Sequence, residues 1–461
     1  MLSLIPKLHE LVGTAASRNV AQLSELGVEP ADRSTSIAVV VTPSSSPGQW
    51  LMATTLIDML LRLDPLVGEV IVDAPGMDES RLAADLAARL PLVTGSAHDP
   101  AGYSIGIGAG TVGVDLAADA AGWVAAIGEA VGADDDGNPI GPLAGAALTA
   151  AEVFKWAFGA IYPERAGLLE MTPWRGVFSF FSYDLDRVSP PIRDIRIAAT
   201  LVGAGGVGAG FVRAIAALSH RVSGSLDLID DDVLTTDNLN RVSFATLASA
   251  LVGTQKVVEA EALLRSCCPN LTVVGYPETF DTYKQRTPRR ADRLYDVVIT
   301  GLDDDQIRWE IQRDLPRILI DGATGKDMVA RVERVEFGRY GCLGCSRHPA
   351  PIAAAADVNC DAAPDPHAPS LSFLSAFPGI LAAGELIKEA MGSGQLRGHF
   401  DHVSATAQTP TWSEPPRSGL TARWDAVGPP NSASTGRNTR ARTYLADRVR
   451  CRRTNRADRR G

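Results

Sequence analysis

A glycine-rich turn lies near the middle of the chain. The segment LVGAGGVGAGFVRAIAAL places Gly203, Gly205 and Gly208 in a G-x-G-x-x-G pattern, between an apolar stretch typical of a strand and a helical stretch. Glycines allow a tight turn and a close approach of the backbone to phosphate. The N-terminus of the following helix offers free N–H groups and a positive dipole end. The pattern therefore predicts a nucleotide-binding turn.

An acidic residue follows this turn at the distance that a ribose needs. The apolar stretch GSLDLID ends in Asp230, 27 residues after Gly203. A carboxylate there can accept hydrogen bonds from ribose hydroxyls, each charge-assisted bond contributing roughly 1.5 to 3 kcal/mol. This arrangement suits both NAD(P) and ATP. A second G-x-G-x-x-G, at Gly108, Gly110 and Gly113, is not followed by such a strand, so we expect it to be structural.

The segments after Asp230 favour ATP. The loop DDDVLTTDNLNR presents Asp232, Asn238 and Arg241, VGTQK adds Lys256, and TGLDDDQIR places Asp303 at the end of a strand. Guanidinium, amide and ammonium groups stabilise the charge that develops on a triphosphate attacked at its α-phosphorus. A carboxylate at a strand end is a suitable Mg²⁺ ligand. We therefore expect ATP and Mg²⁺ as cofactors. An NAD(P)-dependent oxidoreductase and a non-catalytic nucleotide-binding scaffold are the alternatives.

These motifs resemble, in their order, the ThiF/MoeB/HesA superfamily of adenylating enzymes, which includes the ubiquitin-activating enzymes. The motifs are the glycine turn, D-x-D-x5-N-x2-R, G-x2-K, and Asp303 followed five residues later by Arg308. The resemblance covers residues 195–392 approximately. It implies ATP-dependent adenylation of the C-terminal carboxylate of a ubiquitin-like protein or peptide, with release of pyrophosphate. It further implies that Arg241, Lys256 and Asp303 are catalytic and that Asp303 binds Mg²⁺. The nucleotide-binding set is Gly203, Gly205, Gly208, Asp230, Asp232, Asn238, Arg241 and Lys256.

Three cysteines are candidates for a zinc site or for a step after adenylation. Members of this superfamily often carry two C-x-x-C pairs that bind a structural Zn²⁺, but here only Cys342 and Cys345 form such a pair, so zinc stays an open alternative. Cys360 falls where some members keep a cysteine that accepts the activated acyl group, which makes transfer to Cys360 a candidate second step. Its neighbours Asp357 and Asp361 would raise the pKa of the thiol, and an incidental loop cysteine is the alternative.

Apolar runs of strand length alternate with helical stretches throughout the chain, as in SIAVVVT, GQWLMATTLIDMLLRL and VGEVIVDAP. This pattern predicts an α/β protein with two halves, each a Rossmann-like, doubly wound and mostly parallel sheet, of which only the C-terminal half keeps an intact nucleotide site. We expect a degenerate Rossmann-like or substrate-recognition domain at 1–190, the adenylation domain at 191–400, and a disordered Arg-rich tail at 401–461. Residues 341–378 are expected to form a long loop.

The two halves share a weak similarity. Residues Ala150–Gly159 and Ala383–Gly392, offset by 233 positions, match at five of ten positions. Chance matching in an Ala-rich chain and a duplicated architecture both explain this. Each copy keeps a glutamate and a lysine three residues apart, and we expect two surface ion pairs, Glu152 with Lys155 and Glu385 with Lys388.

Composition limits the classes of protein further. The 461 residues carry a net charge of −10, and the segment 437–461 holds ten Arg against two Asp, so the remainder carries about −18. No secretory signal or membrane-spanning stretch is evident, and the six Cys show no regular disulfide spacing. We expect a cytoplasmic protein with a ubiquitin-like or peptide partner, without membrane contact, and with nucleic-acid binding disfavoured. A homodimer and a pseudo-dimer within one chain are both open.

Overall fold

The structure of the chain is a computed structural model that describes residues 19–24, 26–29, 34–42, 45–74, 102–108, 111, 113–131, 135–169, 171–286, 296–325, 328–336, 343, 370–392 and 403–404. They form two α/β halves whose sheets contain six and seven strands. The predicted fold class, two mostly parallel Rossmann-like halves, is confirmed.

The first half holds a six-stranded sheet in the order β2-β1-β3-β4-β5-β6. Its parallel strands are β2 (Val67–Asp73), β1 (Thr35–Val41), β3 (Tyr103–Ile107) and β4 (Leu116–Ala121), and β5 (Val124–Ile127) and β6 (Gly176–Ser179) are antiparallel. Its helices are α2 (Pro47–Leu61), α4 (Ile140–Ile161) and the short η1 (Pro163–Leu168). The predicted βαβ unit is therefore β1, α2 and β2.

The second half holds a seven-stranded sheet in the order β13-β12-β11-β10-β7-β8-β9. The strands are β7 (Ile195–Val202), β8 (Val222–Ile229), β9 (Leu271–Tyr276), β10 (Val297–Thr300), β11 (Ile318–Gly325), β12 (Val329–Glu336) and β13 (Val403–Ser404). The helices are α5 (Gly206–Leu218), η2 (Ser219–Arg221), η3 (Thr236–Asn240), α6 (Leu247–Val252), α7 (Lys256–Cys267), α8 (Phe280–Arg286), α9 (Asp305–Arg313) and α11 (Ser372–Met391).

The two sheets have the same topology once β9 is set aside. The order β8-β7-β10-β11-β12-β13 repeats β2-β1-β3-β4-β5-β6, with four parallel strands followed by two antiparallel ones in each case. Helices α2 and α5 follow the equivalent strands β1 and β7, and α4 and α11 are the long late helices. This correspondence supports the duplicated architecture. Gly108 follows β3, and the next described element is the strand β4, so within the described residues no helix follows Gly108 as a phosphate site needs.

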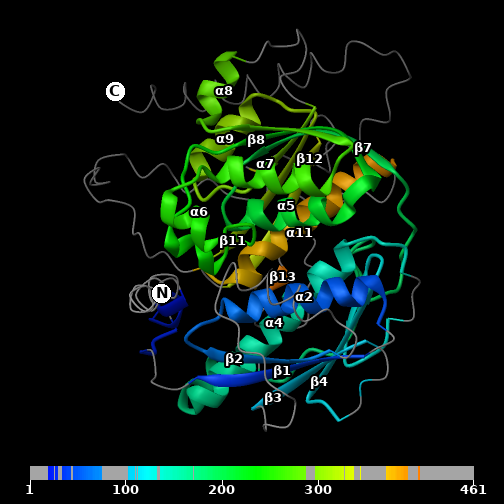
Figure 1. The fold of residues 1–461 in the computed structure, drawn as a ribbon, viewed down its shortest axis with the longest axis vertical. Helices are drawn as coiled ribbons and strands as arrows, with labels where there is room; N and C mark the ends of the chain where they lie inside the picture. Colours follow the sequence, from blue (N-terminus) through cyan, green and yellow to red (C-terminus); the bar gives the residue numbers. More distant parts are fainter. Residues whose placement is uncertain are drawn as a thin grey trace, which may run out of the picture.

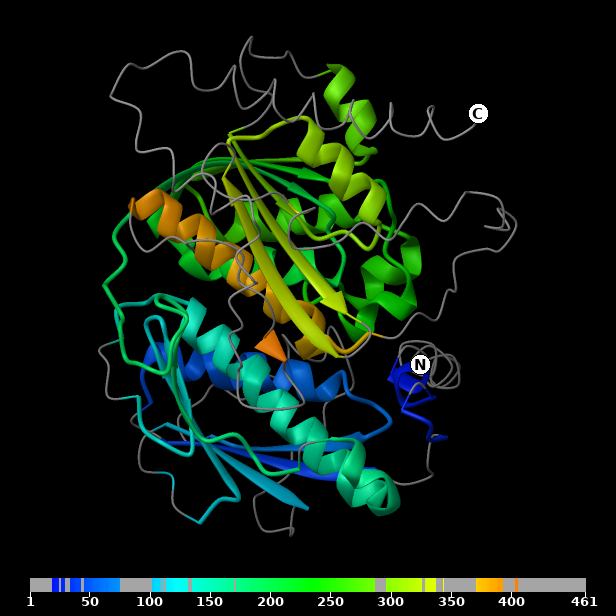
Figure 2. The same ribbon diagram turned by 180° about the vertical axis from the view of Figure 1, so that it is seen from behind.

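Figures 1 and 2 show the halves stacked with their helices between the sheets. Helices α2 and α4 cover the inner face of the first sheet, α5 and α11 cover the inner face of the second, and α8 and α9 lie on its outer face. One continuous core joins the halves, with Phe154 of α4 and Phe373 of α11 at 5.8 Å between ring centroids. No helix within the described ranges is both long and apolar enough to cross a membrane.

Helix α11 begins earlier than the sequence predicted, because residues from Ser372 to Pro378 are helical instead of part of the loop expected at 341–378. Pro378 lies inside this helix. A Cβ atom on Gly379 would come within 1.9 Å of the Val207 carbonyl oxygen, so α11 touches α5 backbone to backbone there. Packing against α5 therefore outweighs the helix-breaking tendency of the proline.

The two Glu–Lys pairs are buried, so the expectation of surface ion pairs was wrong. Lys155 lies 2.7 Å from Glu152, and Lys388 lies 2.8 Å from Glu385, with both members of the second pair 0% exposed. They are buried because α4 and α11 form the layer between the sheets. The i,i+3 spacing predicted the pairing of each glutamate with its lysine, but it could not show that this face of α4 and α11 is covered by the rest of the fold.

Candidate functional site

The glycine turn joins β7 to α5, and two of its glycines are required by packing. Gly203 has a φ of +93°, and a Cβ there would lie 2.7 Å from the Gly301 carbonyl oxygen. A Cβ on Gly208 would lie 2.1 Å from the carbonyl oxygen of Gly203. By contrast, a Cβ on Gly205 would meet nothing within 4 Å. The turn is therefore closed on the protein side at Gly203 and Gly208 and open at Gly205.

Open space lies at Gly205, directly before the N-terminus of α5. Its N-cap residue is Gly205, and within the described part of the chain no side chain caps this helix end. The first N–H groups of a helix have no partner inside the helix, and the dipole makes this end positive. A phosphate group would satisfy both features.

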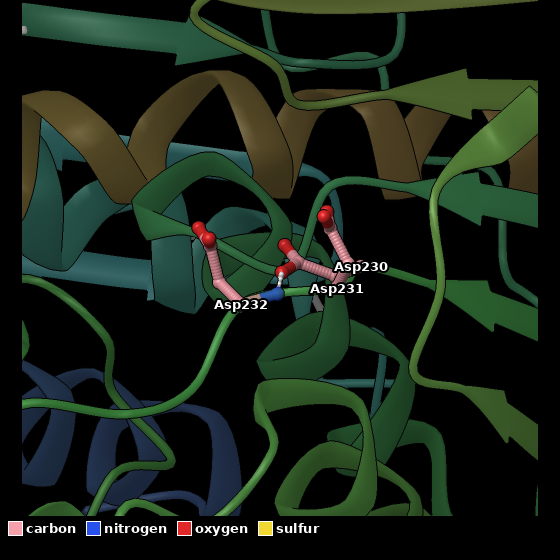
Figure 3. Close-up of side chains that lie close together, drawn as sticks. All are labelled: Asp230, Asp231 and Asp232. Carbon is pink, nitrogen blue, oxygen red and sulfur yellow. Dashed lines mark hydrogen bonds between the residues drawn. The ribbon is translucent and has the colours of Figure 1, made fainter.

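Asp230 lies at the end of β8, directly beside the turn. Its Oδ2 accepts a hydrogen bond from the Ala204 N–H at 2.6 Å, and its Oδ1 accepts one from the Asp232 N–H at 2.9 Å (Figure 3). The side chain is 8% exposed, and burial raises the pKa of Asp230 against the opposing effects of Lys256 and the two N–H donors. Each carboxylate oxygen keeps a further lone pair for a ribose hydroxyl.

Lys256 connects the loop after β8 to helix α7. Its Nζ lies 2.6 Å from Asp232 Oδ2 and 3.9 Å from Asp230 Oδ1, and its side chain is 9% exposed. Its backbone N–H also donates to the Asp232 carbonyl at 3.0 Å. The structure thus brings Asp230, Asp232 and Lys256 together, with one cation between two carboxylates at the turn.

Asn238 and Arg241 belong to η3 and the residue after it. Asn238 is buried, and its Oδ1 accepts a hydrogen bond from the Thr235 N–H at 3.1 Å, which completes a capping box. Arg241 donates from Nη1 to the Asp237 carbonyl and to Asn240 Oδ1, both at 2.9 Å. The Arg241 Cδ lies 3.4 Å from where a Cβ on Gly206 would stand, so this side chain passes the first turn of α5.

Asp303 follows β10 on an exposed segment, two residues after Gly301, whose carbonyl backs the glycine turn. It reaches the same edge of the sheet as Asp230. Within the described ranges, the acidic group close enough to share one cation consists of Asp230, Asp231 and Asp232, whose ligand oxygens lie within 4.8 Å of one another (Figure 3). Asp303 is not a member of that group.

Three buried residues, Arg308, Asp321 and Thr300, support the Asp303 segment. The family pattern included Arg308, but the sequence gave no role to Asp321 or Thr300. Arg308 of α9 pairs with Asp321 of β11 at 3.2 Å between Nε and Oδ1, and it also donates to the Leu302 carbonyl. Thr300 donates to the same Asp321 oxygen at 2.5 Å. These bonds hold the end of β10 beside the turn. The available signal was an aspartate inside the apolar stretch RILIDGATG.

Cys342, Cys345 and Cys360 lie outside the described residues, as does the tail apart from Val403 and Ser404. The described cysteines are Cys267 and Cys268. Burial raises the pKa of Cys268 to about 11, which disfavours a thiolate nucleophile.

Comparison with known proteins points to one family. The model of the ThiF family matches residues 192–416. The crystal structure of Escherichia coli MccB with succinimide is 18% identical, with 43% of this chain and 57% of that chain covered and a TM-score of 0.34. The structure of E. coli MccB with ATP is 19% identical, with 43% and 56% covered and a TM-score of 0.34.

The structure of E. coli tRNA N6-threonylcarbamoyladenosine dehydratase, TcdA, is 17% identical, with 43% of this chain and 87% of that chain covered and a TM-score of 0.29. The chain thus spans a little over half the length of the MccB structures. A comparison with curated proteins gave no match.

Proposed function

We propose, from the premise that residues 192–416 form a ThiF-family domain, that the chain adenylates a carboxylate with ATP and releases pyrophosphate. One juxtaposition carries the proposal. An uncapped helix end lies beside a ribose-binding carboxylate, Asp230, and beside the two cations Lys256 and Arg241. The helix end and both cations suit the negative charge of a triphosphate.

The proposed chemistry converts a poor electrophile into a good one. A carboxylate oxygen of the substrate attacks the α-phosphorus of ATP, forming a new P–O bond. The bond between the α-phosphorus and the bridging oxygen breaks, and pyrophosphate leaves with the electron pair. The product is an acyl adenylate, which a thiol or an amine can attack. Cationic groups fixed at the phosphates lower the barrier because negative charge develops on their oxygens.

The residues divide into ribose and phosphate contacts. Asp230 would accept hydrogen bonds from the ribose, while Asn238, Arg241 and Lys256 would hold the triphosphate. Lys256 now pairs with Asp232, which is 69% exposed, so a phosphate can replace this carboxylate as its partner. Carboxylates are the preferred ligands of Mg²⁺, and Asp303 with the group Asp230–Asp232 offers them. A bound Mg²⁺ would neutralise charge on the phosphate oxygens.

The substrate and the role of the first half are parts of the same proposal. We assign the substrate as the C-terminal carboxylate of a peptide or ubiquitin-like protein. The first half is a degenerate copy that covers the α5 and α11 face, which makes one chain a pseudo-dimer. Acyl transfer to Cys360 and Zn²⁺ at Cys342 and Cys345 stay predictions from the sequence.

Exchange of radiolabelled pyrophosphate into ATP tests the reaction. The full chain is assayed with Mg²⁺ and a pool of peptides with free C-termini, with the same pool amidated as the control. Exchange that occurs with the free acids and not with the amidated peptides supports the proposal. Lys256→Met should abolish most of this exchange. Absence of ATP binding together with binding of NAD⁺ would favour the oxidoreductase instead.

A further inference from the structure

Helix η3, which carries Asn238 and leads to Arg241, is held from the first half of the molecule. Arg62 is the C-cap residue of α2, and its side chain is 1% exposed. Its Nη1 donates to the Leu239 carbonyl, at the end of η3. Its Nη2 donates to Asp58 Oδ1 at 2.9 Å, which fixes the guanidinium on its own helix. The contact joins residues 177 positions apart in the sequence.

A second link runs parallel to the first. Asn19 donates from Nδ2 to the carbonyls of Arg62 and Asp64, at 2.7 Å in each case. Its Oδ1 accepts a hydrogen bond from Asn240 Nδ2 at 3.3 Å, and Asn240 also donates to the Ser370 carbonyl at 2.8 Å. The last two residues of η3 are therefore both held by side chains of the first half, in a buried setting.

These links act on the segment that the proposed triphosphate site depends on. A 3₁₀ helix has poorer hydrogen bonds than an α-helix and is stable only in short pieces, so its position depends on outside contacts. Arg241 donates a hydrogen bond to Asn240 Oδ1, and Arg241 and Arg62 line the same small pocket between the halves. A shift of Leu239 or Asn240 would thus move Asn238 and Arg241 together.

We propose that Arg62 is a positioning residue of the triphosphate site. Together with Asn19, it holds η3 in place from the first half without touching the nucleotide. This inference rests on the proposed function of η3. It gives the first half a defined task, because the degenerate copy supplies the support for the loop of the intact copy.

The test is calorimetric titration of the full chain with ATP plus Mg²⁺ and, separately, with adenosine. Arg62→Gln should weaken ATP binding about tenfold and leave adenosine binding within about twofold, since adenosine has no phosphate for η3 to hold. Asn19→Ala changes no charge and should show the same selectivity to a smaller degree. Arg62→Lys keeps a cationic donor and should recover part of the ATP affinity.

Tyr183→Phe is the matched control. It removes another buried bond between the halves, from Tyr183 to Glu385 at 2.8 Å. Glu385 lies about 20 Å along α11 from its first residue, Ser372, whereas η3 is bonded to Ser370 just before that helix. This variant should bind ATP as wild type does. Equal losses of ATP and adenosine affinity in Arg62→Gln, or an ATP loss in Tyr183→Phe as large, would overturn the inference. Wild-type ATP affinity in Arg62→Gln would overturn it while leaving the proposed function intact, whereas a wild-type chain that binds no ATP would refute the proposed function itself.

Discussion

The strand-to-helix turns of the two halves occupy equivalent places and end in opposite states. At the start of α2, Ser46 accepts a hydrogen bond from the Gln49 N–H at 3.3 Å, and Gln49 Oε1 accepts one from the Ser46 N–H at 2.7 Å. The Gly48 N–H donates to Asp135 Oδ2 at 2.6 Å. At the start of α5, Gly205 offers no side chain, and no described residue caps the helix.

The presence or absence of a cap decides whether a helix end can accept a phosphate group. Both ends present the same N–H groups and the same dipole, but in the first half the chain itself supplies the acceptors. The first half even keeps an aspartate, Asp73, at the end of its second strand, in the region equivalent to Asp230. A strand, a helix and an acid are therefore insufficient, and the free helix end is what distinguishes the second half.

The largest expected effect comes from closing the open turn. Gly208→Val places a side chain where even a Cβ would lie 2.1 Å from the Gly203 carbonyl oxygen. The turn must shift, so ATP affinity should fall more than about 100-fold in a calorimetric titration. An affinity within a few-fold of wild type would mean that the phosphates do not bind at this turn.

The next effect concerns the cation at the turn. Lys256→Met should weaken ATP binding by about 1.5 to 3 kcal/mol, the scale of a lost charged hydrogen bond, and leave adenosine binding unchanged. Lys155→Met is the matched variant, since Lys155 is also a buried lysine in an ion pair, but in the first half. It should leave ATP affinity unchanged. Comparable losses in both variants would argue for a general effect of destabilisation.

Lys388, the buried lysine paired with Glu385 in the second half, lies among aromatic rings. Lys388 lies 3.8 Å from the centroid of the Tyr183 ring and 5.5 Å from that of Trp123. Burial lowers the pKa of Lys388 to about 8, against the opposing effect of Glu385, with Arg334 adding to the lowering. Burial raises the pKa of Tyr183 well above its usual value, so this ring stays neutral in the range considered.

This pKa predicts how stability depends on pH. Between about pH 8 and 10.5 the unfolded chain binds more protons than the folded chain, because the usual lysine pKa is 10.5. The Lys388 side chain should therefore add roughly 2 kcal/mol to the free energy of unfolding between pH 8 and 10. The raised pKa values of Cys268 and Tyr183 act in the opposite direction, so this contribution is measured as the difference between the wild type and Lys388→Met. Denaturant titrations at several pH values measure it. Relative to the wild type, Lys388→Met should lose stability progressively as the pH rises from 8 to 10, and Lys155→Met should not; the reverse pattern would contradict the assignment.

The smallest effect tests the closed turn. Ser46→Ala removes the side-chain cap of α2 and should lower the free energy of unfolding by about 1 kcal/mol. ATP affinity should not change, because the proposed nucleotide site is at the start of α5 and not of α2. A loss of ATP affinity as large as that of Lys256→Met would contradict the assignment of the phosphates to the start of α5.

The sequence predicted what depends on local patterns. The strands, the glycine turn and the acid after β8 follow from short-range periodicity and residue type, and the structure has them at the expected places. The start of α11 was missed because Pro378 is typical of a loop, whereas packing against α5 keeps it helical. The burial of Lys388 and the reach of Arg62 to Leu239 depend on contacts between distant segments, which spacing along the chain does not reveal.

The most direct test of the central claim is calorimetric titration of the wild-type chain with ATP plus Mg²⁺ and, separately, with NAD⁺, repeated on Arg241→Ala. The account predicts that ATP binds, that NAD⁺ does not compete with it, and that the substitution weakens ATP by about 1 to 3 kcal/mol. Binding of NAD⁺ in place of ATP, or ATP binding that ignores Arg241→Ala and Lys256→Met alike, would contradict the triphosphate site.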